Sequence, residues 1–161
     1  LKNSLISKGH IFRTDTDSEV LVHLYEEYDV KMLDYLRGMF SFVIWDSNRQ
    51  KLFCARDRLG IKPFFYSLSK DRFVFGSEIK AILKSTNISK KISPSSLDSF
   101  FTYGYVTGNK TIFKDIKKLL PGNALEIDMK SGYKLKIWPY WKLNFTPNFN
   151  KSETQWKFEL E

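Results

Sequence analysis

Residues 39–57 read MFSFVIWDSNRQKLFCARD, and this stretch decides the fold class. Its first part, MFSFVIWD, is apolar almost throughout, which is typical of a strand covered on both faces. The polar run SNRQ favours a turn, and KLFCARD then has the composition of a returning strand. The stretch therefore predicts an antiparallel pair of strands near the centre of the chain.

Further strands are predicted on the C-terminal side of this pair. Residues 64–69 and 72–78 have strand composition and are joined by Lys-Asp, so the four strands together read as an antiparallel meander. A late hairpin is expected over residues 121–141, with its turn at Lys130 to Gly132.

Helices are predicted on both sides of the strands. Their starts and ends are marked by capping residues, by proline in a first turn and by glycine terminators. The expected helices are 17–28, 30–37 ending at Gly38, 77–85 with Ser77 as its cap, 92–106 with Ser93 before Pro94, and 152–161 with a capping box of Ser152 and Gln155. Helices and strands in separate runs predict an α+β fold, with antiparallel sheets layered against helices.

Composition and charge narrow the classes of function. The chain is 42% hydrophobic and 16% aromatic over 161 residues, which fits a globular protein. The net charge is +8, but the basic residues are spread along the chain without a recognition-helix or zinc-finger pattern, so no nucleic-acid partner is expected. No apolar run reaches the roughly 18 residues of a membrane span, so no membrane partner is expected. The single cysteine, Cys54, fits a reducing compartment, and its strand context favours a buried packing role over a nucleophile.

The acidic stretch TDTDSE, residues 14–19, raises the question of a metal site. A calcium loop of the EF-hand type needs glycine at its sixth position and glutamate at its twelfth. Counted from Asp15, these positions hold Val20 and Glu26, so the glycine is missing and no metal site is expected.

A helix start explains the same stretch better. Thr16 and Glu19 have the spacing of a capping box, and Asp17 lies in the first turn, where a carboxylate meets the positive end of the helix dipole. A carboxylate in this position could also accept hydrogen bonds from the ammonium group of a ligand. The local pattern leaves both roles open for Asp17.

Two other features attract attention. The stretch RDRLGIKP, residues 56–63, reads either as a rigid, ion-paired turn or as a docking surface for another domain. The two histidines, His10 and His23, have no Ser, Cys or metal-ligand partner at a useful spacing, so both are expected to be surface or packing residues.

Taken in order, these stretches resemble one family. GHIFRTDTDSEVLVHLYEEYDVKMLDYLRGMFSFVIWDSNRQKLFCARDRLGIKPFFY, RFVFGSEIKAIL and LPGNALEID are similar to the glutaminase domain of glutamine-hydrolysing asparagine synthetases. The resemblance implies a class II glutamine amidotransferase with an N-terminal-nucleophile fold, in which two antiparallel sheets lie between helix layers. In that family an N-terminal cysteine attacks the glutamine side-chain amide, with its own α-amino group as the base. The ammonia released passes to a second domain, where ATP activates aspartate.

The family's functional residues carry over only in part. Asp17 matches the carboxylate that binds the α-amino group of glutamine. The catalytic cysteine, the arginine for the α-carboxylate and the oxyanion asparagine and glycine have no counterpart, and we expect them upstream of Leu1. The pyrophosphate loop of the synthetase domain is expected beyond Glu161. Met39 is a candidate for the inner end of the glutamine pocket, with core packing as the alternative.

The resemblance also divides the chain. It implies the C-terminal two-thirds of a glutaminase domain at 1–137, an interdomain linker at 138–151 and the first helix of a synthetase domain at 152–161. Glutamine and the synthetase domain, docked through the 56–63 face, are the implied partners; a homodimer is left open. ATP and magnesium are expected only in the synthetase domain, and the implied compartment is the cytoplasm.

The implied activity belongs to the full-length protein. We expect that protein to be a glutamine-dependent asparagine synthetase, and the chain alone to be inactive. Two alternatives stay open from the sequence. One is a degenerate glutaminase-like module that only docks a partner. The other is a different class II glutamine amidotransferase, such as one serving sugar-phosphate amination.

Overall fold

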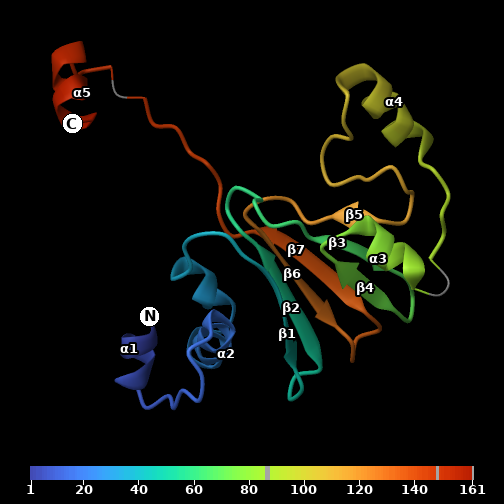
Figure 1. The fold of residues 1–161 in the computed structure, drawn as a ribbon, viewed down its shortest axis with the longest axis horizontal. Coiled ribbons are helices and arrows are strands. Elements are labelled where there is room, and N and C mark those ends of the chain that lie inside the picture. The colour runs from blue at the N-terminus through green and yellow to red at the C-terminus, as the bar shows by residue number, and fades with distance from the viewer. Residues whose placement is uncertain (86–87, 148, 161) are drawn as a thin grey trace.

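The computed structural model describes residues 1–85, 88–147 and 149–160, and within them the chain forms two antiparallel sheets with helices on their outer sides (Figure 1). The helices are short except for α2 and α4, and the strands have two to six residues. In chain order the elements are α1 (Lys2–Ile6), α2 (Asp17–Tyr28), the 3-10 helix η1 (Asp29–Asp34), β1 (Ser41–Asp46), β2 (Lys51–Arg56), β3 (Phe65–Leu68), β4 (Phe73–Gly76), α3 (Ile79–Lys84), α4 (Pro94–Tyr103), β5 (Lys117–Lys118), β6 (Asn123–Asp128), β7 (Lys134–Pro139) and α5 (Glu153–Leu160).

The strand order confirms the central pair and corrects the rest of the predicted sheet. β1 and β2 form the expected antiparallel hairpin, with Val43 opposite Cys54. The predicted four-strand meander is wrong, because β3 and β4 belong to a second sheet of order β4-β3-β5. The free edge of β2 is taken instead by the late hairpin, which gives the first sheet the order β1-β2-β6-β7. Local composition predicts strands, but it carries no signal for which distant strand pairs with which.

Alternating residues of β2 belong to two different cores. Phe53 and Ala55 point toward the helices, while Cys54 between them points toward the second sheet. The helix-side core contains Leu5, Leu24, Met32, Leu33, Leu36, Phe53, Ala55 and Ala124. The core between the sheets contains Cys54, Phe64, Tyr66, Leu119, Leu125 and Ile127. Each fully buried side chain of the Phe or Leu type contributes roughly 1.5–3 kcal/mol of transfer free energy, so β2 is stabilised from both sides.

These cores define the layers of the fold. Helices α1 and α2 cover one face of the first sheet, the second sheet lies on its other face, and α3 packs against β3 and β4 (Figure 1). The predicted α+β architecture, with antiparallel sheets between helices, is confirmed.

The helix after α2 differs from its prediction. Residues 30–37 were expected to be helical, but the structure has a 3-10 helix over Asp29–Asp34. Asp29 has φ +52°, a value that interrupts the α-helical backbone of α2 and starts a tighter turn. Arg37 lies beyond η1, and its Nη1 donates hydrogen bonds to the carbonyl oxygens of Asp34 (2.9 Å) and Leu36 (3.0 Å).

The first strand is less covered than its composition suggests. β1 is an edge strand, and Trp45 keeps 45% of its surface exposed. A cleft of about 450 Å³ lies between β1 and β4, lined by Val43, Trp45 and Phe75 among others. The prediction of a strand buried on both faces is therefore wrong at this edge, although Phe42 and Ile44 pack on the helix-side core.

Of the helix starts predicted at Ser77, Ser93 and Ser152, the last two are confirmed. Ser93 is the N-cap of α4, with Pro94 in the first turn as expected. At α5, the Ser152 N–H donates to Gln155 Oε1 (2.8 Å) and the Gln155 N–H to Ser152 Oγ (3.4 Å), which confirms that capping box. The predicted cap Ser77 is wrong, because α3 begins one residue later and Glu78 is its N-cap.

The chain leaves the layered body after β7. This strand runs to Pro139, two residues beyond the expected boundary at 137. The Tyr140 hydroxyl donates to the Arg56 carbonyl oxygen (2.8 Å), so the body extends past the strand. Residues 142–147 have no regular structure, and α5 lies well away from the sheets (Figure 1). Residue 148 of the predicted linker and residue 161 of the predicted helix lie outside the described residues.

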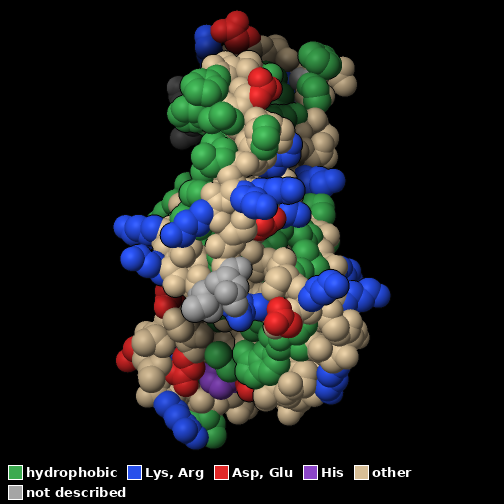
Figure 2. Space-filling view, turned by 90° about the vertical axis from the view of Figure 1, so that its right-hand side faces the viewer, with side chains coloured by type: hydrophobic (Ala, Val, Ile, Leu, Met, Phe, Trp, Pro, Cys, Tyr) green, Lys and Arg blue, Asp and Glu red, His purple; other side chains and the backbone are tan. Residues whose placement is uncertain are grey.

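Surface charge is consistent with the composition. Figure 2 shows Lys and Arg side chains spread among other side chains over one face of the molecule, without a single basic stripe. Within the described residues, no helix combines the length and the apolar character that crossing a membrane requires.

Candidate functional site

The loop before α2 is closed by Glu19. Its carboxylate accepts the backbone N–H groups of Arg13 (2.8 Å) and Thr14 (2.7 Å) and the Thr14 hydroxyl (2.5 Å). The hydrogen bonds from the Arg13 N–H and the Thr14 hydroxyl hold the pKa of Glu19 at about 2, below its ordinary 4.5. Thr16 is the N-cap of α2, but its side chain makes no capping hydrogen bond. The predicted capping box is therefore wrong in its partners. It would pair Glu19 with the Thr16 N–H, whereas Glu19 binds the N–H groups of Arg13 and Thr14.

The other two acids of the loop have different surroundings. Asp15 forms an ion pair with Lys2 Nζ at 2.5 Å. Among the described residues, the Asp17 carboxylate is in no ion pair and accepts one long hydrogen bond, from Ser18 Oγ at 3.5 Å. The structure thus separates three acids that the sequence could not distinguish, and leaves Asp17 with unused acceptor capacity at the start of α2.

Asp17 lines a cleft of about 580 Å³ between the start of α2 and the segment that enters β1. Two cationic side chains, Arg37 and Lys62, line the same cleft. Its apolar wall includes Val20, Leu21, Leu36, Phe40 and Phe42. One carboxylate and two cations around an apolar wall suit a small zwitterion, whose ammonium and carboxylate groups need opposite charges at separate places.

Met39 lies in this cleft too. Its side chain is 63% exposed, so the alternative of core packing is wrong. Neither Arg37 nor Lys62 was singled out from the sequence. Arg37 is close to Met39 in the sequence, and Lys62 belongs to the 56–63 turn. No local pattern shows that these two segments meet in the fold, so the sequence could not select either residue.

The 56–63 turn is held together by one buried carboxylate. Asp57 is 1% exposed, and its oxygens accept the backbone N–H groups of Leu59 (3.2 Å), Ile61 (2.9 Å) and Lys62 (2.9 Å). Burial alone would raise the pKa of Asp57, but the backbone N–H groups outweigh it and hold the pKa below its ordinary value. The Asp57 N–H also donates to the Phe40 carbonyl oxygen (2.9 Å), which ties the turn to the cleft.

Arg56 completes the turn by bonding to backbone groups. Its guanidinium donates to the carbonyl oxygens of Lys62, Leu119 and Gly60, each at 2.7 Å. The predicted rigidity of this turn is confirmed, but the predicted ion pairing is wrong: among the described residues Arg56 and Asp57 bond to the backbone and form no ion pair. Leu59 and Ile61 of the same turn are 69% and 55% exposed.

Cys54 takes no part in the cleft. Its thiol is fully buried between the two sheets, and burial raises its pKa. A thiol that resists deprotonation is a poor nucleophile, so the predicted packing role is confirmed.

Both histidine side chains are only 15% exposed, which fits the predicted packing role, but the prediction that neither has a partner is wrong. His10 Nδ1 and His23 Nδ1 are 3.1 Å apart, and Glu26 Oε2 lies 3.0 Å from His23 Nδ1. His10 lies in the irregular segment after α1 and His23 lies on α2, so no regular spacing in the sequence predicts their contact.

Known proteins agree with this architecture. A family model described as "Glutamine amidotransferase domain" matches residues 1–141. Asparagine synthetase [glutamine-hydrolyzing] 3 of Bacillus subtilis is 44% identical over 144 residues, covering 89% of this chain and 23% of that protein. Asparagine synthetase [glutamine-hydrolyzing] 2 of the same organism is 38% identical over 148 residues, covering 89% of this chain and 19% of that protein. The chain therefore spans about a fifth of the length of these relatives.

A solved structure shares the fold. The glutamine phosphoribosylpyrophosphate amidotransferase of B. subtilis, complexed with ADP and GMP, matches with a TM-score of 0.55 and 23% identity. The match covers 87% of this chain and 26% of that one. The likeness supports the layered arrangement of two sheets between helices.

Proposed function

The chain belongs to the glutamine amidotransferase domain family, and from this premise we propose that it holds glutamine for hydrolysis within a glutamine-dependent asparagine synthetase. The observation that carries the proposal is the Asp17 carboxylate, which lines the cleft and is in no ion pair among the described residues. Asp15 and Glu19, its neighbours in the loop, are both engaged by the protein itself.

The chemistry of the cleft supports an amino-acid ligand. An ammonium group has three donors and no acceptor, so a free carboxylate is its natural partner. Arg37 and Lys62 provide positive charge in the same cleft, which favours the α-carboxylate of the same ligand. Met39 stands in the wall of the cleft, which supports its proposed place at the inner end of a glutamine pocket.

The remaining chemistry belongs to other parts of the full-length protein. Cys54 is buried between the sheets, so it is not the nucleophile, and we assign the attack on glutamine to an N-terminal cysteine outside this chain. ATP and magnesium would bind in a synthetase domain, where ATP would convert the side-chain carboxylate of aspartate to an adenylate and ammonia would then displace AMP from it. A cytoplasmic location fits a protein that uses ATP and whose cysteine is free.

The 56–63 turn is the proposed docking surface for the synthetase domain. Its backbone is fixed by Asp57 and Arg56, and it presents Leu59 and Ile61 to solvent. A rigid turn with exposed apolar side chains loses little conformational entropy on docking.

The assignment of Asp17 is tested in the full-length protein with Asp17→Ala. We expect the KM for glutamine to rise on the order of 100-fold, because a charge-assisted hydrogen bond contributes roughly 1.5–3 kcal/mol. Asparagine synthesis from free ammonia should be unchanged, since the synthetase domain is untouched. Steady-state assays with glutamine or ammonium chloride as the nitrogen source measure both.

The matched control is Asp15→Ala, which removes an acid from the same loop but only breaks the exposed pair with Lys2. It should leave both activities near wild type. An unaltered glutamine KM in Asp17→Ala would show that Asp17 does not bind glutamine. Failure of the full-length protein to amidate aspartate with either nitrogen source would reject the synthetase assignment itself.

A further inference from the structure

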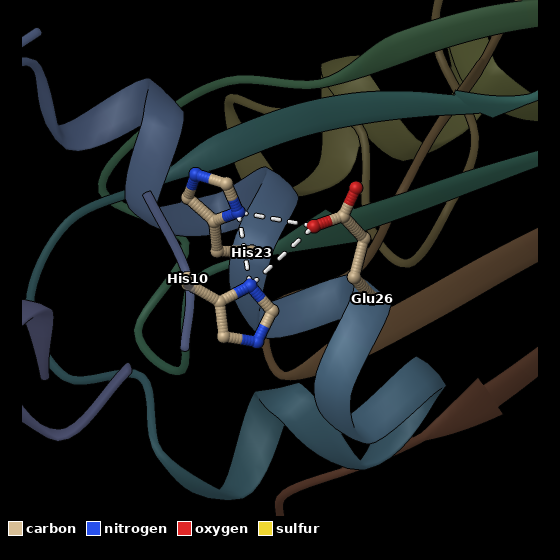
Figure 3. Close-up of side chains that lie close together, drawn as sticks. All are labelled: His10, His23 and Glu26. Carbon is tan, nitrogen blue, oxygen red and sulfur yellow. Dashed lines mark hydrogen bonds and ion pairs between the residues drawn. The ribbon is translucent and has the colours of Figure 1, made fainter. Parts of the chain in front are cut away.

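Three potential ligand atoms converge outside the glutamine cleft. His10 Nδ1, His23 Nδ1 and Glu26 Oε2 form a triangle with sides of 3.1, 3.0 and 3.6 Å. Figure 3 shows both imidazole rings and the carboxylate turned toward one another. None of the three residues lines the cleft that contains Asp17.

The fold holds these atoms together from two segments. His23 and Glu26 lie one turn apart on α2, at positions i and i+3, so they share a helix face. His10 lies on the segment between α1 and α2, where its N–H donates to the Leu5 carbonyl oxygen at 3.1 Å. The Phe12 ring meets the His23 ring edge-on, with centroids 4.5 Å apart. The triangle is therefore a product of packing and not of one flexible side chain.

The triangle has the dimensions of a zinc site. Zn²⁺ binds His nitrogen and carboxylate oxygen at roughly 2.0–2.2 Å in a tetrahedron, which places ligand atoms about 3.3 Å from one another. The observed sides bracket that separation. We propose that His10, His23 and Glu26 bind a Zn²⁺ ion. Two imidazoles and one carboxylate suit zinc, whereas calcium and magnesium prefer oxygen ligands alone.

Burial leaves one side of the site open. The two histidine side chains are each 15% exposed, but the Glu26 side chain is 56% exposed. A zinc ion held by three protein ligands needs a fourth ligand, which is commonly water. The exposed side of Glu26 is where solvent could supply it.

The far nitrogens of both rings face further carboxylates. Histidines that bind a metal through one nitrogen usually donate the other N–H to a carboxylate or carbonyl, which fixes the tautomer. His10 Nε2 lies 3.2 Å from Glu27 Oε2. His23 Nε2 is buried without a hydrogen bond, and Glu19 Oε1 is 3.8 Å away. Zinc on Nδ1 requires the proton on Nε2, and this proton would point to the Glu19 carboxylate.

A bound ion would act as a clip in the fold. It would cross-link His10, in the segment after α1, to His23 on α2, and residues 11–22 would lie between the two linked positions. This stretch contains Thr14 and Asp17, so zinc would restrict the backbone around Asp17, the residue proposed to bind glutamine. This role is separate from glutamine binding and would hold even if Asp17 had another function.

The test is a zinc titration of the full chain after removal of metals with EDTA. Competition with a chromophoric chelator, using ZnCl₂ as the probe, should give one Zn²⁺ per wild-type chain, and excess MgCl₂ should not displace it. Glu26→Ala should weaken zinc binding by about 100-fold or more, and Glu27→Gln by about 10-fold, as expected for a ligand and for the partner of a ligand. Glu153→Ala, which removes an exposed acid from α5, should bind zinc as wild type does.

Folding is monitored by circular dichroism in every variant. His23→Gln should also lose zinc, but its ring packs on Phe12, so Glu26→Ala decides the outcome if His23→Gln unfolds. Two results would overturn the proposal: no zinc bound by the wild-type chain, or zinc bound by folded Glu26→Ala with unchanged affinity.

Discussion

Two loops in this protein use an aspartate in opposite ways. In the 56–63 turn, the Asp57 carboxylate is buried and accepts three backbone N–H groups. In the 14–19 loop, the Asp17 carboxylate has a single long hydrogen bond and lines a cleft. The acceptor positions of Asp57 are filled by N–H groups of its own turn. Asp17 makes only that one long bond among the described residues and keeps acceptor positions unfilled.

The comparison shows that the hydrogen-bond partners of a carboxylate determine its role. A carboxylate has about four acceptor positions, and whichever groups fill them decide whether the residue builds structure or binds a ligand. The same substitution, Asp to Asn, should therefore have very different effects in the two loops.

Asp57→Asn should produce the largest loss of stability. The new amide NH₂ must face backbone N–H groups, which leaves buried donors unpaired, and we expect a loss of about 2–4 kcal/mol in the free energy of unfolding. Urea denaturation at neutral pH measures this loss. A loss below about 1 kcal/mol would show that the turn does not depend on this carboxylate.

The same variant carries a pH signature. Burial tends to raise the pKa of Asp57, but the N–H groups hold it below its ordinary 3.8. A lowered pKa means that the carboxylate stabilises the fold above the pKa of the unfolded chain and ceases to do so as the pH falls through the folded value. The gap between wild type and Asp57→Asn should therefore persist down to about pH 4 and narrow below it.

Gly60→Ala should have the next largest effect. Gly60 has φ +70°, and an added Cβ would lie 2.7 Å from Pro121 Cγ. The left-handed backbone costs alanine roughly 1–2 kcal/mol, and the clash adds to it. Gly108→Ala is the matched control, because Gly108 has φ +64° with nothing within 4 Å of the added Cβ. Thermal unfolding of both variants separates the two costs, and equal losses would show that Pro121 moves aside freely.

Asp17→Asn should have the smallest effect on stability. It removes a charge from the first turn of α2 and no short hydrogen bond, so the expected loss is below about 1 kcal/mol. Urea denaturation under the conditions used for Asp57→Asn measures it. A loss as large as at Asp57 would mean that Asp17 is structural, and the contrast between the two loops would fail.

Much of the fold could be predicted from local sequence, but pairing between distant segments could not. Helix 17–28 and the β1–β2 hairpin follow from periodicity and turn composition, which are properties of neighbouring residues. That β6 lies beside β2 depends on the length and path of the chain between them. The same holds for His10 and His23, which meet only because α1 packs against α2.

The candidate site, too, could be predicted only in part from the sequence. Asp17 could be selected by resemblance, yet its freedom from ion pairing became visible only when Asp15 was found with Lys2 and Glu19 with the backbone. Glu19 missed its predicted partner because the segment before α2 curls back over the helix start and offers nearer N–H groups at Arg13 and Thr14.

The place where the chain leaves the layered body, just after β7, has a mechanical consequence. The Gly122 carbonyl oxygen accepts the N–H groups of Tyr140 (2.9 Å) and Trp141 (3.2 Å), and the Gly122 N–H donates to the Asp57 carbonyl oxygen (2.9 Å). Tension in the segment that leads to α5 would enter the folded body here. The pull would reach the 56–63 turn through one hydrogen bond, and the Phe40 carbonyl beside the cleft through the next. Motion of whatever is attached beyond residue 141 thus has a route of three hydrogen bonds, through Gly122 and Asp57 to Phe40, to the wall of the cleft that contains Asp17.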